Sequence, residues 1–167
     1  MEMTMTIETF AAEWMKEAEL TERVLIALTD ESLQQQIDAE RRTLGDLAWH
    51  LVTSIHFMRG LGLDFDHIDD RSELTNSAIG IAEEYRRLNQ AFLQAVRQQW
   101  TDESLHVFHA IAGEEWRNDE SLRYSLMHQA HHRGQMTVLM RQAGLKTPPL
   151  YGPTYETWIE QGKVPLK

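Results

Sequence analysis

The sequence from Asn118 to Gly144 is NDESLRYSLMHQAHHRGQMTVLMRQAG, and it reads as one long amphipathic helix. At a period of 3.6 residues, His128 and His132 lie one turn apart on the same face of this helix. The pattern therefore predicts two imidazole rings that point toward the interior of the protein from neighbouring turns. The same face continues on both sides of the two histidines with the mostly apolar residues Leu122, Ser125, Leu126, Met136, Leu139 and Ala143.

Two inward histidines at this spacing can share one metal ion, as they do in the zinc-binding helices that carry HExxH. A metal ion needs a third protein ligand, and the chain contains no cysteine that could supply one. His50 is the best candidate among the other histidines, because it lies within the apolar periodic segment TLGDLAWHLVTSIHFM at residues 43–58. If the two helices are neighbours, His50 faces the same space as His128 and His132.

The ordinary interpretation of each histidine has to be considered beside this one. A single buried histidine is more often a hydrogen-bonded core residue than a metal ligand. His131 lies about 100° round the helix from His132, so we predict a position beside the site or on the surface. The same ordinary role is predicted for the remaining histidines, which are His56, His67, His106 and His109.

Length and composition indicate one globular domain. The chain has 167 residues, of which 42% are hydrophobic and 25% charged, and this is enough for one domain to bury its own core. We therefore expect a single domain over residues 1–167. The absence of cysteine excludes a disulfide framework and any thiolate from the protein itself, which fits a reducing cytoplasm.

The formal net charge of -10 argues against a nucleic-acid partner, because phosphate binding needs clustered Lys and Arg. No segment approaches the roughly 18 uninterrupted apolar residues of a membrane span, so no membrane partner is expected. The N-terminal residues are acidic and lack the apolar region of a secretory signal. The expected location is the cytoplasm.

Three further segments carry a helical stripe of apolar residues, at about residues 7–29, 43–59 and 76–99. Thr43 and Asp46 supply a capping-box-like start for the second of them. Between residues 101 and 117 the helical period is lost, and the alternation in SLHVFHAIAG indicates a strand-like connection. The acidic loop DFDHIDD at 64–70 lacks the glycine and terminal glutamate of a calcium-binding EF-hand loop, so we interpret it as a solvated loop.

The tail from about residue 145 contains all 4 prolines of the chain, and we predict that it is non-helical. Its aromatic residues Tyr151, Tyr155 and Trp158 favour packing against the bundle or against a second subunit. Four amphipathic helices with long connections indicate an all-α protein, a four-helix bundle with long crossover connections.

Three segments together resemble the DinB-like superfamily, which includes the YfiT-like proteins. They are LAWHL around His50, HQAHHRGQ at 128–135 and the ending QAGLKTPPLYGPTYETW at 142–158. The resemblance covers nearly the whole chain, and HxxxHRGQ is its most specific part. It implies a bundle with an unusual crossover order, often a homodimer, and a divalent metal held by three histidines. Carried over to this sequence, the ligands are His50, His128 and His132, and zinc, nickel and iron all suit such a site.

The resemblance also implies a class of reaction. Relatives of this kind include transferases and isomerases that use low-molecular-weight thiols such as bacillithiol or mycothiol. Three protein ligands leave a coordination position open, where a thiol would lose its proton before attacking a small electrophilic substrate. The first hypothesis is therefore a metal-dependent thiol S-transferase, and a metal-dependent hydrolase that acidifies water is its neighbour. The sequence identifies no general base, so no catalytic residue is predicted.

Two hypotheses from other classes stay open at this point. One is a non-catalytic, dimeric stress-response protein whose metal is structural or absent. The other is a bundle that binds an apolar ligand without a metal. In the RGQ segment, Arg133 and Gln135 suit either helix packing or contact with a substrate, and Gly134 is predicted to allow a close approach between helices.

Overall fold

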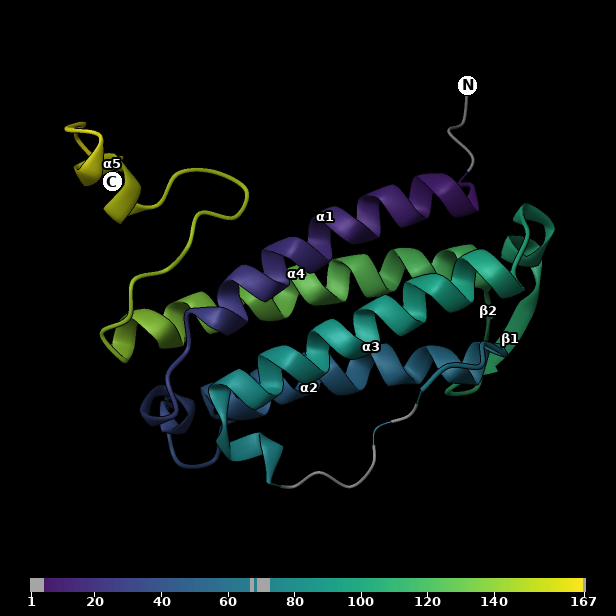
Figure 1. Ribbon diagram of the computed structural model, residues 1–167, viewed down its shortest axis with the longest axis horizontal. Helices are drawn as coiled ribbons and strands as arrows, with labels where there is room; N and C mark the ends of the chain where they lie inside the picture. The colour runs from purple at the N-terminus through teal and green to yellow at the C-terminus, as the bar shows by residue number, and fades with distance from the viewer. Residues whose placement is uncertain (1–4, 67, 69–72, 167) are drawn as a thin grey trace.

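The computed structural model describes residues 5–66, 68 and 73–166, and four long helices dominate this part of the chain (Figure 1). They begin and end within a few residues of the predicted positions, so the prediction of a four-helix bundle is confirmed. None of the described helices combines the length and apolar character needed to cross a membrane. The helices are α1 (Ile7–Ile26), α2 (Leu44–His56), α3 (Ala78–Gln99) and α4 (Asn118–Gln142).

Local sequence signals explain where α2 begins and ends. The Thr43 hydroxyl accepts a hydrogen bond from the Asp46 backbone N–H at 3.0 Å, and the Asp46 carboxylate accepts one from the Thr43 N–H at 2.8 Å. This is the capping box that the sequence predicted. After His56 the helix tightens into a 3-10 turn (Phe57–Leu61), which stops at Gly62. Gly62 has φ of 89°, a left-handed conformation that glycine adopts without steric cost.

The helices do not pack in chain order. Both α1 and α2 pack mainly against α3 and α4, so α1 and α2 lie diagonally across the bundle, as do α3 and α4. In Figure 1, α1 and α4 run in one direction while α2 and α3 run in the other. Chain connections therefore have to cross the bundle or return along its length, and the predicted long crossovers are confirmed. This order places α2 directly beside α4.

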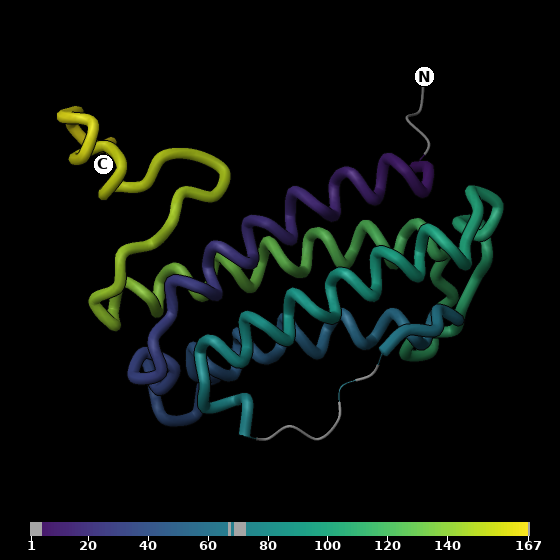
Figure 2. The backbone as a smooth tube through the Cα atoms, in the orientation of Figure 1, coloured from purple at the N-terminus to yellow at the C-terminus, as the bar shows by residue number. Residues whose placement is uncertain are grey.

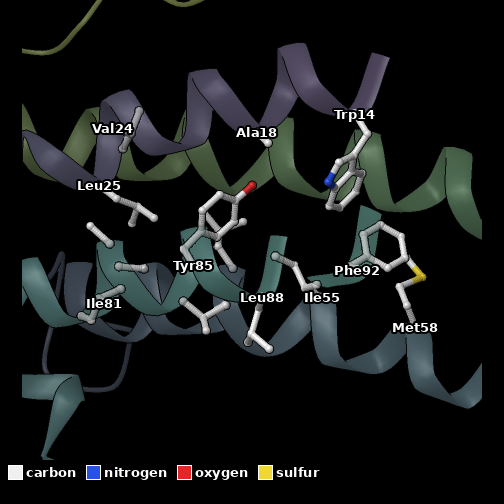
Figure 3. Close-up of a cluster of buried hydrophobic side chains, with 14 of the residues drawn as sticks. Trp14, Ala18, Val24, Leu25, Ile55, Met58, Ile81, Tyr85, Leu88 and Phe92 are labelled. Atoms are coloured by element: carbon white, nitrogen blue, oxygen red, sulfur yellow. The ribbon is translucent and has the colours of Figure 1, made fainter. Parts of the chain in front are cut away.

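A shared hydrophobic core joins the helices, and Figure 3 shows its centre. Trp14 of α1 meets Phe92 of α3 in an edge-to-face contact with ring centroids 4.8 Å apart. The Trp14 indole N–H donates to the Asn89 side-chain oxygen at 2.5 Å, so the buried ring also satisfies its polar atom. Ile55 and Leu88 are 1% and 0% exposed, and each such side chain contributes roughly 1.5–3 kcal/mol to folding.

The strand-like connection predicted before α4 is a small antiparallel hairpin. Its strands are β1 (Phe108–Ile111) and β2 (Glu114–Arg117), which pair from Phe108 opposite Arg117 to Ile111 opposite Glu114. Ala112 and Gly113 form the two-residue turn, with φ of 52° and 89°. Positive φ at both positions matches the twist of a tight hairpin. Figure 2 shows the hairpin at the end of the bundle where α2 ends and α4 begins.

The prediction of a non-helical tail from about residue 145 is wrong in part, because the tail contains a short helix, α5 (Tyr155–Glu160). The Thr154 hydroxyl caps it by accepting from the Thr157 N–H at 3.2 Å. The prolines lie outside these six residues, so they do not prevent one turn and a half of helix. Leu145 and Leu150 pack against the core, whereas the rings of Tyr151 and Tyr155 are largely exposed.

The acidic loop lies only partly within the described residues. Asp64 and Asp66 form ion pairs with Arg59 at 3.4 Å and Arg87 at 2.8 Å. Such exposed pairs are typical of a solvated surface and contribute little to stability. The remaining residues of this interpretation, His67, Asp69 and Asp70, lie outside the described part of the chain.

A buried ion pair connects α4 to α1 and to the tail. The Arg133 side chain is 0% exposed, and its guanidinium is paired with the Glu17 carboxylate and contacts the Tyr151 hydroxyl. It also donates to the Glu17 backbone carbonyl at 3.0 Å and to the Thr21 hydroxyl at 2.8 Å. Gln129 extends the network, since its side-chain oxygen accepts from the hydroxyls of Thr21 and Tyr85. The buried cation is thus paired through its two terminal nitrogens, while its Nε atom has no partner among the described residues.

Removal of Glu17 should therefore be costly. We expect Glu17→Ala to lower the free energy of unfolding by about 3 kcal/mol, because it leaves the Arg133 charge buried without its partner. Urea denaturation measures this change. The matched control is Glu19→Ala on the same helix, where the ion pair with Arg23 is exposed and a change of about 0.5 kcal/mol or less is expected. Equal effects of the two substitutions would contradict a structural role for the buried pair.

Candidate metal centre

Three histidine rings converge between α2 and α4. His50 comes from the middle of α2, and His128 and His132 come from successive turns of α4. The His128 Nε2 atom lies 3.1 Å from the His50 Nε2 and 3.0 Å from the His132 Nε2. One ligand atom from each ring lies within 4.8 Å of the other two. The structure thus brings together the three side chains that the sequence singled out as candidate ligands.

The orientation of the rings fits a metal ion. The Nδ1 atom of His132 lies 2.7 Å from the Gln135 side-chain oxygen, which can only accept, so Nδ1 carries the proton. In the neutral ring the Nε2 atom then has a free lone pair, and it points at the other two histidines. Nitrogen ligands of a tetrahedral ion with bonds of about 2.0–2.1 Å lie roughly 3.3 Å apart. The two spacings from His128, 3.1 and 3.0 Å, therefore need only a small expansion to match those of one divalent ion.

Burial keeps the three imidazoles in the neutral form that binds metal. It is the main cause that lowers the pKa of each ring, to about 4 for His128. Charge repulsion from His132 lowers the pKa of His50 and His128 further, and Arg42 acts in the same direction on all three. The hydrogen bond to Gln135 partly opposes the shift in His132. At neutral pH no proton has to leave before a metal binds.

A cavity of about 480 Å³ opens onto His50 and His128, a size typical of small-molecule sites. It lies between α2, α4 and the hairpin. Tyr124, one turn before His128, stacks on that ring with centroids 5.7 Å apart, and Trp116 of the hairpin meets Tyr124 edge-on at 5.5 Å. The large apolar and aromatic side chains that line the cavity are Trp14, Phe57, Ile111, Trp116 and Tyr124.

A second hollow of about 520 Å³ lies on the other side of the histidines, toward the C-terminal end of α4. It is lined by His132 and Gln135 and by two cations, Arg41 and Arg42, that precede α2. Arg41 has a loose surface ion pair with Asp38 at 3.7 Å. Two arginines against the single carboxylate of Asp38 give this hollow a net positive lining, on a chain with a formal net charge of -10. The three histidines therefore separate an apolar cavity from a basic hollow.

The other histidines stay outside this site. His131 is exposed, and its ring lies 4.9 Å from the His132 ring, which agrees with the predicted position beside the site. His106 is exposed, while His56 and His109 are half-buried at the end of α2 and in β1. Within residues 5–66, 68 and 73–166, no second group of three metal-ligating side chains comes together. His67 lies outside the described residues.

The structure decides the roles that the RGQ segment left open. Arg133 packs into the core, and Gln135 fixes the orientation of His132. The prediction that Gly134 allows close helix approach is wrong, because Gly134 is exposed and an added Cβ would meet no atom within 4 Å. The sequence reasoning also missed Tyr124, although its position four residues before His128 was a usable signal. No local pattern could have placed Trp116 beside it, since the hairpin brings it there.

The protein is thus a four-helix bundle with a candidate metal centre. Its second and fourth helices supply the three histidines of that centre. The sequence model of the DinB family matches residues 1–163, and the chain belongs to this family. The resemblance seen in the sequence is thereby confirmed.

Individual relatives agree with this assignment. The chain is 42% identical over 161 residues to the uncharacterized protein YrdA of Bacillus subtilis strain 168, with 96% of each chain covered. A solved DinB-like protein from Bacillus cereus ATCC 10987 has a TM-score of 0.83 and 45% identity, covering 89% of this chain and 100% of that one. The DinB-like protein YjoA of Bacillus subtilis has a TM-score of 0.67 at 16% identity, covering 86% and 97%, and supports the fold alone.

Metal content tests the centre directly. We expect natively purified protein to hold about one divalent ion per chain, measured by elemental analysis, and His132→Ala to lose it because two imidazoles bind far more weakly than three. His131→Ala is the matched control, since that residue is exposed and does not belong to the group of three histidines, and it should keep the ion. Equal metal content in the two variants would contradict the proposed ligand set.

The stability of chelator-treated protein should depend on pH through the same rings. Their pKa values are lowered on folding, so between pH 6.5 and about 4 the unfolded chain binds more protons than the folded one. The stability that the three neutral histidine rings contribute is complete above pH 6.5 and is lost as the pH falls toward 4. Denaturation midpoints over this range should fall less steeply in His128→Gln than in the wild type. An identical slope would show that His128 is not a buried neutral ring.

Proposed function

We propose that this DinB-family protein is a metal-dependent transferase that joins a low-molecular-weight thiol to a small electrophilic molecule. The observation that carries the proposal is the position of His50, His128 and His132 between two hollows of different chemistry. When bound, a divalent ion such as zinc, nickel or iron supplies Lewis acidity, which favours the thiolate form of a thiol. The chain has no cysteine, so the sulfur has to come from a cosubstrate.

The protein's own residues prepare this site before any ligand arrives. The two α4 histidines are held on a rigid helix, and Gln135 fixes the His132 ring with its Nε2 lone pair toward the site. Tyr124 stacks on His128 and limits the rotation of that ring. Preorganised ligands of this kind lose little entropy on binding, and three protein ligands leave a position for a cosubstrate.

The two hollows suit the two reactants of a transfer reaction. The larger apolar walls lie on the side of His50 and His128, where they would surround an uncharged electrophile and exclude water. Arg41 and Arg42 lie on the side of His132, where they would pair with the carboxylates of an acidic thiol such as bacillithiol. Binding on both sides would hold the sulfur near the electrophile and so replace a bimolecular encounter by an oriented one.

We also propose that the protein acts in the cytoplasm as a homodimer, as the family resemblance implies. The exposed side chains of Ile37 and Val138 support this proposal, because both line the basic hollow. Exposed apolar groups in one hollow are typical of surfaces that a partner covers. A second copy at this surface would narrow access to the hollow.

The decisive experiment supplies the metal-loaded protein with bacillithiol, mycothiol, glutathione or coenzyme A and with 1-chloro-2,4-dinitrobenzene as a generic electrophile. We expect conjugation with at least one thiol, and its loss in His132→Ala. For an acidic thiol, Arg42→Ala should raise KM about 10-fold while kcat changes little, because it removes one charge-assisted contact. Arg23→Ala, which removes a surface cation on α1, is the control and should leave both constants unchanged.

The outcomes separate the competing functions. Metal-loaded protein that conjugates none of the four thiols would overturn the transferase. Release of nitrophenol from 4-nitrophenyl acetate without any thiol would instead establish the hydrolase alternative. A fall in the thermal midpoint on chelation, without either activity, would establish a structural metal in a non-catalytic protein.

A further inference from the structure

The hydroxyl of Ser121 is buried against the apolar cavity without a protein partner. The Ser121 side chain is 3% exposed and belongs to the wall that also contains His50 and His128. Within the described part of the chain, its Oγ atom has no hydrogen-bond partner. A buried hydroxyl without a partner lowers stability, and most buried polar atoms in proteins avoid this situation. A molecule bound in the cavity could supply the missing partner.

The other serine and threonine hydroxyls of the same wall differ from Ser121 in this respect. Ser125, one turn later on α4, donates to the Ser121 backbone carbonyl at 2.9 Å. On α2, Ser54 donates to the Leu51 carbonyl at 2.9 Å, and Thr53 donates to the His50 carbonyl at 3.1 Å. The protons of these three groups are thus committed to the backbone. The Tyr124 hydroxyl also makes no hydrogen bond to a described residue, but Tyr124 is 49% exposed, so Ser121 is the buried hydroxyl of the described wall that lacks a partner.

The position of Ser121 on α4 determines how far its hydroxyl lies from the histidines. It lies seven residues before His128 on the same face of α4, and at 1.5 Å per residue this is about 10 Å along the helix. Tyr124 and Ser125 lie between them on α4, and Phe57 of the 3-10 turn after α2 and Trp116 of the hairpin line the same cavity. The cavity therefore has a largely aromatic middle, the histidines at one end and the buried Ser121 hydroxyl toward the other, and the Glu114 carboxylate of the hairpin is also part of its lining.

We propose that this cavity selects an elongated, uncharged molecule with a hydroxyl, carbonyl or amide group that hydrogen-bonds to the Ser121 Oγ. Its apolar body lies against Tyr124 and Trp116, and its reactive end lies at the histidines about 10 Å away. The inference rests on the proposed function, because it describes the electrophilic substrate of that same site. A charged group is disfavoured at the Ser121 end, where the hydroxyl is buried and cannot compensate a full charge.

The test compares two naphthalenes of nearly the same shape. 2-Naphthol carries a hydroxyl group at the position where 2-methylnaphthalene carries a methyl group. Their dissociation constants are measured by equilibrium dialysis with the full chain. The preference is the ratio of the dissociation constant of methylnaphthalene to that of naphthol. In Ser121→Ala this ratio should fall about fivefold, because one neutral hydrogen bond to naphthol is lost. Ser125→Ala is the matched control, because its hydroxyl is already bonded to the backbone, and it should leave the preference unchanged.

The folded state gives an independent readout. Because the Ser121 hydroxyl has no partner among the described residues, Ser121→Ala should unfold at an unchanged or higher temperature. A lower midpoint would show that the hydroxyl serves the fold, and it would overturn the proposal. The proposal is also overturned if neither naphthalene binds, or if both serine variants change the preference equally.

This binding test needs neither a thiol nor turnover, so its result separates from that of the proposed function. A fivefold loss of preference in Ser121→Ala together with no thiol conjugation would support the Ser121 contact and overturn the transferase. Thiol conjugation together with an unchanged preference would do the reverse.

Discussion

The arrangement of the molecule depends on α4, which carries buried polar side chains on two of its faces at once. Gln129 and Arg133 point toward α1 and α3, where they meet Thr21, Tyr85 and Glu17. The two α4 histidines point toward α2. Apolar packing alone is non-directional, whereas a buried polar group without its partner costs free energy. The three helices that these side chains contact, α1, α2 and α3, are therefore fixed in their position along the α4 axis.

This constraint links the candidate metal centre to the stability of the bundle. His132 and Arg133 are adjacent in sequence but point to different sides of α4, so a shift of the helix would disturb the ion pair with Glu17 and the contact with His50 together. Tyr151 joins the same network from the tail, which ties the segment after α4 to α1. A site built in this way on two packed helices is held more firmly than one built on loops.

The chemistry next to the histidines depends on elements that carry none of the ligands. The hairpin between α3 and α4 brings Ile111 and Trp116 over the apolar cavity, and the segment before α2 brings Arg41 and Arg42 to the opposite hollow. In a family that shares one bundle, such connecting segments are where binding properties can change without disturbing the core. The three histidines thus come from the helices of the bundle, whereas several of the side chains that surround them come from the connecting segments.

The sequence alone determined those features that depend on local periodicity and local hydrogen bonds. It placed the four long helices, the capping box at Thr43 and the shared face of His128 and His132, because each involves residues within one or two turns of one another. The three segments around His50, at 128–135 and at 142–158 together also identified the DinB family. The tail was predicted less well, since prolines exclude a long helix but leave room for α5.

Only the tertiary structure decided which helices became neighbours. His50 and His128 are 78 residues apart, and they meet because α2 packs on α4 rather than on α1. The same packing buries Arg133, turns Gly134 to the solvent and leaves the buried Ser121 hydroxyl without a partner beside a cavity. These outcomes depend on the burial of surfaces from distant segments, and the period of a single helix carries no information about its partner.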